Sequence, residues 1–135
     1  MAYLSSVERL DLACPERGWS VVASMPQARA GSTGCIGPDH CLYVAGGTDD
    51  GSTNCATVIK WDPRAGKWHA VAPMHSRRHY FAGSFAPDGV LHVAGGFEWT
   101  SQLSSAECYD PRADKWRPLP DFGVYMEFCS GAFVW

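Results

Sequence analysis

The feature that most constrains the fold of this chain is a sequence repeat with a period near 48 residues. Residues 42–47 read Leu-Tyr-Val-Ala-Gly-Gly and return as Leu-His-Val-Ala-Gly-Gly at residues 91–96, identical at five of six places. Residues 62–68 return at residues 110–116, identical at six of seven places. Prolines and tryptophans recur at the same interval: Pro26, Pro73, Pro120, Trp19, Trp68 and Trp116. A fixed period of this length is typical of solenoids and propellers, in which each repeat is one structural unit.

Each repeat predicts four short strands, because short apolar stretches alternate with turn residues and no amphipathic helical stretch is found. We expect strands at residues 30–36, 41–45, 56–61 and 67–71, and again at 80–85, 90–94, 105–109 and 115–119. Residues 97–103 are expected to form a loop. Two further strands are expected at residues 7–10 and 19–23, and one at 129–135. The chain is therefore expected to be all-β.

The recurring residues have mechanical roles in such a fold. A double glycine at the end of a strand permits positive φ and the close approach of a neighbouring backbone. Large aromatic side chains supply flat surfaces for the packing of one sheet on another. We therefore expect a scaffold role for the aromatic residues of the third and fourth strands, which are Trp61, Tyr109, Trp68 and Trp116.

At these residues the sequence resembles the kelch repeat, which forms one blade of a β-propeller. The resemblance is carried by the double glycines, the aromatic-Asp-Pro turns, the tryptophan that follows each turn, and the prolines that close each repeat. It implies an incomplete kelch propeller with two full four-stranded blades at residues 30–78 and 79–125. It also implies a half-blade at residues 1–29 and the first strand of a further blade at residues 126–135.

The length of the chain bears on whether such a propeller can close. Closed propellers need about four to eight blades, whereas 135 residues at this period hold about 2.8. Three explanations stay open. We expect a fragment of a longer kelch protein, and the alternatives are a homodimer that closes a six-bladed ring and an open arc that leans on another protein. Unpaired blade edges are assembly surfaces in each case.

Composition excludes several classes of protein. A net charge of −3 argues against a nucleic-acid binder. The sequence has no run of eighteen apolar residues and no apolar leader, so we expect no membrane association and a cytoplasmic or nuclear location. The six cysteines are expected to be reduced thiols; a bridge between Cys35 and Cys41 and a metal site are the alternatives.

The resemblance also implies a binding face. In kelch propellers of ubiquitin-ligase substrate receptors, both BTB/kelch and F-box/kelch types, this face consists of loops after the double glycine and of segments leading into the first strand. On matching positions here, the loops supply Thr48, Asp49, Asp50, Phe97, Glu98 and Trp99. The segments supply Arg29, Arg77, Arg78 and His79, followed by Tyr125 and Glu127 where the pattern would place an arginine.

Each of these candidates also has a structural interpretation. Arg29 and Arg77 are expected to bind backbone carbonyls between blades, because a guanidinium carries five fixed donors, and Arg78 is expected to be exposed. Phe97 and Trp99 are either interface anchors or packing residues against an adjacent blade. Residues 49–52 resemble a calcium loop only in their acidity, so a solvated turn is expected there.

The resulting functional hypothesis is a protein-interaction module, the substrate-recognition part of a ubiquitin-ligase adaptor or a fragment of one. The alternative is a structural or cytoskeletal scaffolding protein of the same fold, and a copper-radical oxidase is a remote third. The sequence contains no catalytic motif of the common hydrolase, phosphate-binding or metalloprotease kinds. We therefore expect a protein or peptide partner, no enzymatic activity, no cofactor and no metal.

Overall fold

The computed structural model describes residues 3–50 and 52–124. Its regular structure is all strand except for one short 3-10 turn in this part of the chain, η1 (Pro15–Arg17). The strand expected at residues 126–135, together with Tyr125 and Glu127, lies outside the described residues. Within the described part, no helix is long and apolar enough to cross a membrane.

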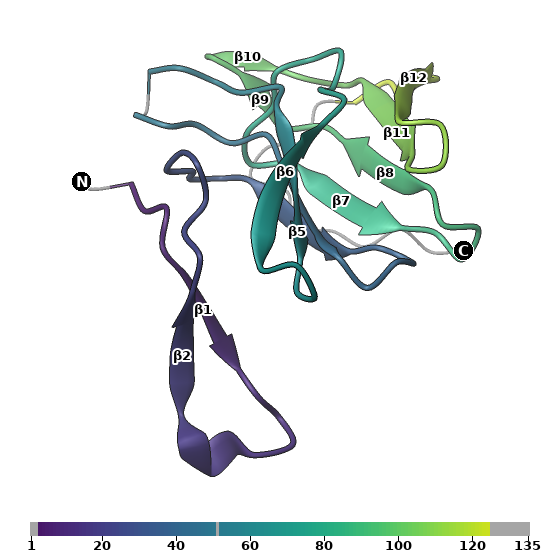
Figure 1. Ribbon diagram of the computed structural model, residues 1–135. Coiled ribbons are helices and arrows are strands. Elements are labelled where there is room, and N and C mark those ends of the chain that lie inside the picture. The colour runs from purple at the N-terminus through teal and green to yellow at the C-terminus, as the bar shows by residue number, and fades with distance from the viewer. Residues whose placement is uncertain (1–2, 51, 125–135) are drawn as a thin grey trace.

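The two repeats form two four-stranded antiparallel sheets (Figure 1). The first blade has the order β3-β4-β5-β6, with β3 (Thr33–Ile36), β4 (Leu42–Ala45), β5 (Val58–Asp62) and β6 (Lys67–Val71). The second has the order β7-β8-β11-β12, with β7 (Ala82–Phe85), β8 (Leu91–Ala94), β11 (Ala106–Asp110) and β12 (Lys115–Leu119). The fourth strands of the two blades begin and end as the sequence predicts, whereas each of the other blade strands differs by one to three residues at one or both ends.

The N-terminal residues form a separate antiparallel hairpin of β1 (Val7–Leu10) and β2 (Trp19–Val22), close to the two strands expected there. In Figure 1 this hairpin extends away from the two blades. The indole Nε1 of Trp68 in the first blade donates a hydrogen bond of 2.8 Å to the carbonyl of Ala23, just after β2. The half-blade is thereby tied to the blade that follows it.

Residues 97–103 are not a plain loop, and the prediction was wrong there. They contain a small hairpin of β9 (Phe97–Glu98) and β10 (Ser101–Gln102) with Trp99 and Thr100 at its tip. The backbone amides of Phe97 and His79 each donate to the other's carbonyl at 3.0 Å. This pairing anchors β9 to the segment before β7. The short β9–β10 hairpin of residues 97–102 is thereby supported by a neighbouring segment.

The contact between the two blades is aromatic. Tyr43 of β4 lies against Phe85 and Tyr109 of the second blade, with ring centroids 5.2 Å and 6.1 Å apart. Tyr109 in turn packs on Trp116 at 5.2 Å. The Trp116 indole donates to the carbonyl of Ala72 at 2.8 Å, the same bond that Trp68 makes one repeat earlier. These tryptophans and tyrosines therefore serve the scaffold, as the repeat predicts.

The double glycines lie where backbones meet. Gly46 has a φ of +63°, and a Cβ built on it would collide with the carbonyl oxygen of Arg78. A Cβ on Gly47, with a φ of +94°, would lie 2.9 Å from the carbonyl of Ala30. Both the left-handed conformation and the close approach require glycine here.

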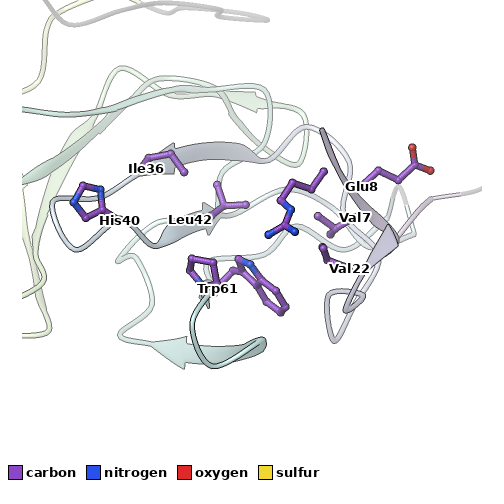
Figure 2. A pocket seen from close by; sticks show the side chains of 9 residues that line it. Val7, Glu8, Val22, Ile36, His40, Leu42 and Trp61 are labelled. Carbon is purple, nitrogen blue, oxygen red and sulfur yellow. The ribbon is translucent and has the colours of Figure 1, made fainter. Parts of the chain in front are cut away.

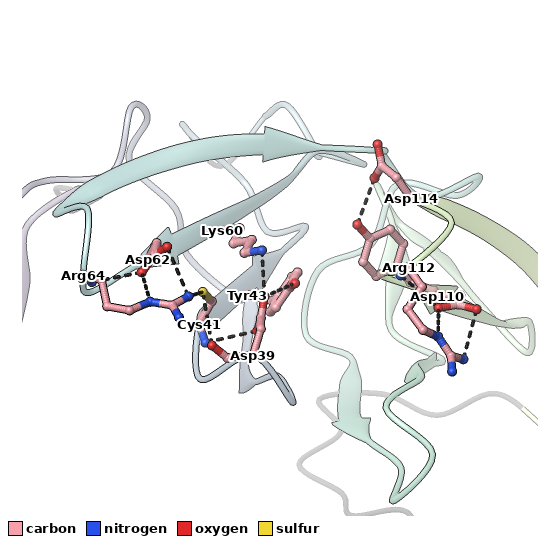
Figure 3. A network of polar contacts seen from close by, with 10 residues as sticks. Asp39, Cys41, Tyr43, Lys60, Asp62, Arg64, Asp110, Arg112 and Asp114 are labelled. Carbon is pink, nitrogen blue, oxygen red and sulfur yellow. Dashed lines mark hydrogen bonds and ion pairs between the residues drawn. The ribbon is translucent and has the colours of Figure 1, made fainter.

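Polar networks fix the turns at the other end of the strands (Figure 3). Asp39 accepts hydrogen bonds from Lys60 at 2.7 Å and from the Tyr43 hydroxyl at 3.0 Å. Burial acts to raise the pKa of Asp39, but the bonds from Lys60, the Cys41 amide and Tyr43 outweigh it and lower the pKa to about 2. In the second blade Asp114 accepts from the Tyr109 hydroxyl and from the amide of Ala72, joining the two blades.

The five cysteines in the described part of the chain are free thiols. Cys35 lies at the junction of the blades, where its Sγ is 3.2 Å from the Gly83 carbonyl as a hydrogen-bond donor. Burial raises the pKa of the Cys35, Cys41 and Cys108 thiols, which keeps them protonated at neutral pH.

Candidate functional site

Two of the predicted arginines are built into the blades. The Arg29 guanidinium donates to the carbonyls of Gly46 and Thr57 at 2.7 Å and 3.1 Å, and to the Thr57 hydroxyl at 2.7 Å. Arg78 makes the same three bonds one repeat later, to the carbonyls of Gly95 and Ser105 and to the Ser105 hydroxyl. Each arginine thus ties the segment before the first strand to the second and third strands of its own blade.

The assignment of the adjacent arginines 77 and 78 was the wrong way round. Arg78, expected to be exposed, is 0% exposed, whereas Arg77, expected to bind carbonyls, is exposed. The repeat itself contains the reason. Arg29 and Arg78 are 49 residues apart, which is also the spacing of Gly46 and Gly95. Applying that spacing to the arginines would have identified Arg78 as the structural one.

Arg78 forms an ion pair that has no counterpart at Arg29 among the described residues, where Asp49 acts only through its charge. Glu107 of β11, 2% exposed, lies 3.2 Å from Arg78 and also accepts from the amides of His75 and Ser76 at 2.7 Å and 3.0 Å. The matching position in the first blade is Ile59, and the Nε of Arg29 has no partner in the described structure. Burial lowers the pKa of both arginines, and Glu107 opposes that effect at Arg78. These buried charges serve the fold and are not presented at the surface.

The exposed part of the predicted face is an open hollow of about 300 Å³, lined by His79, Tyr80, Phe97, Trp99 and Thr100. We refer to it as the aromatic hollow. Tyr80 is 42% exposed and Trp99 is 53% exposed. The His79 ring lies 5.2 Å from the Tyr80 ring and 5.6 Å from the Phe97 ring, measured between centroids. The structure therefore brings together three predicted residues, His79, Phe97 and Trp99.

The backbone at the two exposed aromatic residues is unusual. Tyr80 has a φ of +51° and Trp99 a φ of +57°, in the region that favours glycine. The equivalent of Tyr80 in the first blade is Gly31, with a φ of +65°. Strained residues of this kind persist at functional sites. The sequence prediction missed Tyr80, although a tyrosine at the position of a repeat glycine was the signal that could have found it.

The described residues that line the aromatic hollow carry no formal charge at neutral pH. The one ionisable ring among them at physiological pH, His79, has an Nδ1 3.0 Å from the Phe97 carbonyl. Burial lowers the pKa of His79 below its ordinary value of 6.5, opposed by the bond to Phe97. The imidazole is therefore neutral at pH 7, and the other lining side chains are uncharged.

Comparison with known families decides what these blades are. The kelch motif matches residues 29–75 and again residues 78–123, which together make up more than half of the chain. The chain belongs to the kelch-repeat family. No match was found among curated proteins. The two matched stretches contain the two four-stranded sheets, so the fold is part of a kelch propeller with two full blades and an N-terminal half-blade. Kelch repeats are generally non-enzymatic modules that mediate binding between proteins.

The kelch loop after the first double glycine lies at the same end of the blades as β9 and β10 (Figure 1). Thr48 is buried and pairs its backbone in both directions with Ala30, at 2.9 Å. Asp50 is exposed, and its carboxylate accepts from the amides of Ser52 and Thr53 and from the Ser52 hydroxyl. Asp50 therefore caps its own turn, and Asp49 beside it is half-buried.

The histidines at positions 75 and 79, four residues apart, have separate partners. The Nε2 of His75 lies 3.2 Å from the Trp116 carbonyl, whereas His79 contacts Phe97. Across residues 3–50 and 52–124, no three His, Cys, Asp or Glu side chains lie close enough together to hold a metal ion.

Glu98 is half-buried in β9, between the two aromatic residues of that hairpin. Because successive side chains of a strand point to opposite faces, Glu98 lies on the other face of β9 from Phe97. Its charge acts on Arg78 together with that of Asp121. The carboxylates of Glu98 and Asp121 thus add to the negative charge that faces Arg78.

A second hollow lies at the opposite end of the first kelch blade, where the N-terminal hairpin faces it (Figure 2). Val7 and Val22 of the hairpin face Leu42 and Trp61 of the blade across it. Ile36 at its border is 61% exposed. None of the predicted site residues lines this hollow, which is a gap in the packing of half-blade on blade.

Proposed function

We propose that this kelch chain binds a protein partner through the aromatic hollow and the neighbouring loop at residues 48–50. The observation that carries the proposal is the pair of exposed aromatic residues, Tyr80 and Trp99, held in backbone conformations that favour glycine. Neither side chain belongs to the buried core, and we attribute their exposure in strained conformations to binding.

The chemistry of the hollow fits a protein ligand. Tryptophan and tyrosine are enriched among the residues that dominate binding energy at protein interfaces. Each combines a large apolar surface with a polar group and loses little conformational entropy on binding. The hydrogen bonds of Glu107 to the segment before His79 hold the hollow in place from below. A preformed site of this kind reduces the ordering cost of association.

The finer role we propose is substrate recognition within a ubiquitin-ligase adaptor in the cytoplasm or nucleus. A structural or cytoskeletal scaffold with the same binding face is the second candidate. A BTB or F-box segment encoded alongside this sequence would favour the first role, and its absence from the full transcript would favour the second. Closure of the ring by a second copy remains a separate proposal, which sedimentation equilibrium tests by mass.

The direct test is a quantitative pull-down with the full chain and two variants. Trp99→Ala and Tyr80→Ala each remove one exposed aromatic side chain, and we expect each to lower partner capture by about tenfold or more. Trp19→Ala is the matched control, because Trp19 is 66% exposed but lies on the N-terminal hairpin. Circular dichroism establishes that all three variants remain folded. Equal capture by the Trp99 variant and the parent chain would refute the assignment of this face.

A further inference from the structure

We infer that the partner segment bound at the aromatic hollow is basic: an extended stretch in which a lysine or arginine places its stem in the hollow. This inference rests on the proposed function and specifies the chemistry of the ligand. It is carried by the burial of Arg29 and Arg78 and by the accessible carboxylates of the loops at this end of the blades.

An acidic ligand finds few donors at this face. Arg78 is fully buried and bonded to Gly95, Ser105 and Glu107. Arg29 is buried in the same way in the first blade. A carboxylate entering the hollow would lose its hydration without gaining a counter-charge from either, which is unfavourable.

The accessible charges at this end of the blades are mainly negative. At this end, among residues 3–50 and 52–124, Asp50 and Asp121 are exposed and Glu98 is half-buried, against one exposed guanidinium, that of Arg77, on the segment before β7. Complementary potentials steer association and select partners. The surplus of carboxylates therefore selects a cationic segment.

The geometry of β9 explains how one ligand segment can contact both the aromatic hollow and the Glu98 carboxylate. Phe97 and Trp99 line the hollow, and Glu98 lies on the other face of β9 from Phe97. In an extended ligand that crosses the hairpin tip, successive side chains also point to opposite sides. One basic side chain of the ligand can then place its aliphatic stem against the rings of the aromatic hollow, with its cation over Trp99. The next basic side chain of the ligand pairs with the Glu98 carboxylate.

Fluorescence anisotropy with labelled synthetic peptides tests this inference on the full chain. Three peptides of equal length alternate glycine with arginine, with glutamate or with glutamine. At low ionic strength we expect the arginine peptide to bind at least about tenfold more tightly than the glutamine peptide, and the glutamate peptide to bind least. The preference should shrink as salt is added, because exposed charges are screened.

Variants separate binding at the hollow from general attraction to an acidic protein. We expect Trp99→Ala, which leaves the net charge unchanged, to weaken the arginine peptide about tenfold. Glu98→Gln should weaken it about threefold, whereas Glu16→Gln, which removes an exposed carboxylate from η1 on the N-terminal hairpin, should not.

Two results would overturn the inference. One is binding of the glutamine or glutamate peptide as tight as that of the arginine peptide. The other is an arginine peptide whose affinity does not respond to Trp99→Ala. If partner capture in the pull-down still depends on Trp99 in either case, the proposed function stands and only the basic character of the ligand is wrong.

Discussion

The guanidinium of Arg78 and the carboxylate of Glu107 lie 3.2 Å apart in a part of the second blade that solvent does not reach. The first blade has the same arginine but an isoleucine, Ile59, in place of the glutamate. The first blade thus holds its buried arginine with backbone and hydroxyl acceptors. The second blade uses the same kinds of acceptor and adds a carboxylate. The carboxylate also fixes the segment that leads to the aromatic hollow.

Removing the Glu107 carboxylate should lower the stability of the fold. We expect Glu107→Gln to lower the free energy of unfolding by about 3 kcal/mol, because it leaves a buried charge without a counter-charge. Urea denaturation followed by tryptophan fluorescence measures the change. Arg112→Ala, which breaks the exposed pair of Arg112 with Asp110, is the control and should change stability little. Equal effects of the two substitutions would contradict the assigned role of Glu107.

The tryptophans of the fourth strands should differ in importance. Trp116→Phe removes the indole bond to the Ala72 carbonyl and should cost about 2 kcal/mol, because Trp116 is buried. Trp68→Phe removes the matching bond to Ala23, which is exposed to solvent, and should cost about 0.5 kcal/mol. Thermal unfolding of both variants provides the comparison. A larger loss for the Trp68 variant would show that the half-blade junction is the stronger one.

The lowered pKa of the Asp39 carboxyl group predicts that the stability of the protein decreases at low pH. Its bonds to Lys60, Cys41 and Tyr43 lower the pKa from 3.8 to about 2 in the folded state (Figure 3). A group whose pKa is depressed by folding stabilises the protein above its unfolded pKa, and the contribution is lost as the pH falls through the folded pKa. We expect a contribution of about 1 kcal/mol, allowing for solvent screening, to be lost between pH 4 and pH 2.

Asp39→Asn isolates this contribution. The variant should be less stable than the parent chain at pH 6, and the difference should vanish near pH 2. Urea midpoints measured across this range give both curves. A difference that stays constant with pH would mean that the carboxylate charge is not the stabilising feature.

Two residues replace repeat glycines at positive φ, and we expect opposite responses when the glycine is restored. Asp114, at the position of Gly66, has a φ of +49°, but its carboxylate accepts from the Ala72 amide across the blade junction and from the Tyr109 hydroxyl within its own blade. Asp114→Gly should therefore lower stability by about 1 kcal/mol despite the relief of strain. Tyr80→Gly should leave stability within about 0.5 kcal/mol, because relieved strain offsets the lost packing of a half-exposed ring.

Binding should rank the same two variants in the reverse order. Tyr80→Gly should abolish partner capture, whereas Asp114→Gly should leave it unchanged as long as the protein is folded. Chemical denaturation and the pull-down, carried out on the same preparations, give the two rankings. A strongly destabilised Tyr80 variant would assign Tyr80 to the fold.

The period of the sequence predicted the strands, their order along the chain and the aromatic packing between blades, because the double glycines and the Asp-Pro turns are local signals. Which of the adjacent arginines is buried was not predicted, because two neighbouring side chains of one type offer no local distinction and the 49-residue spacing from Arg29 to Arg78 was not applied to them. The structure resolves it through Gly95 and Ser105, which accept from Arg78 across 17 and 27 residues of chain.

The small β9–β10 hairpin could not be predicted for a similar reason. Its first residue, Phe97, pairs with His79, which is remote in sequence, and its tip contains Trp99 where a turn of this kind favours glycine. Tertiary pairing overrides the local preference there. The family pattern named His79, Phe97 and Trp99, which the structure brings together, whereas the shape of the hollow depends on contacts that the local sequence does not specify.

The tryptophan of each fourth strand reaches back to the carbonyl that follows the fourth strand before it. In each of these contacts the later unit supplies the indole donor and the earlier unit supplies the acceptor. The acceptor is a backbone carbonyl, which any residue can provide. Blades joined in this manner can differ in their outer loops and still pack together. One blade of this chain can therefore carry an aspartate-capped turn while the other carries the uncharged aromatic hollow.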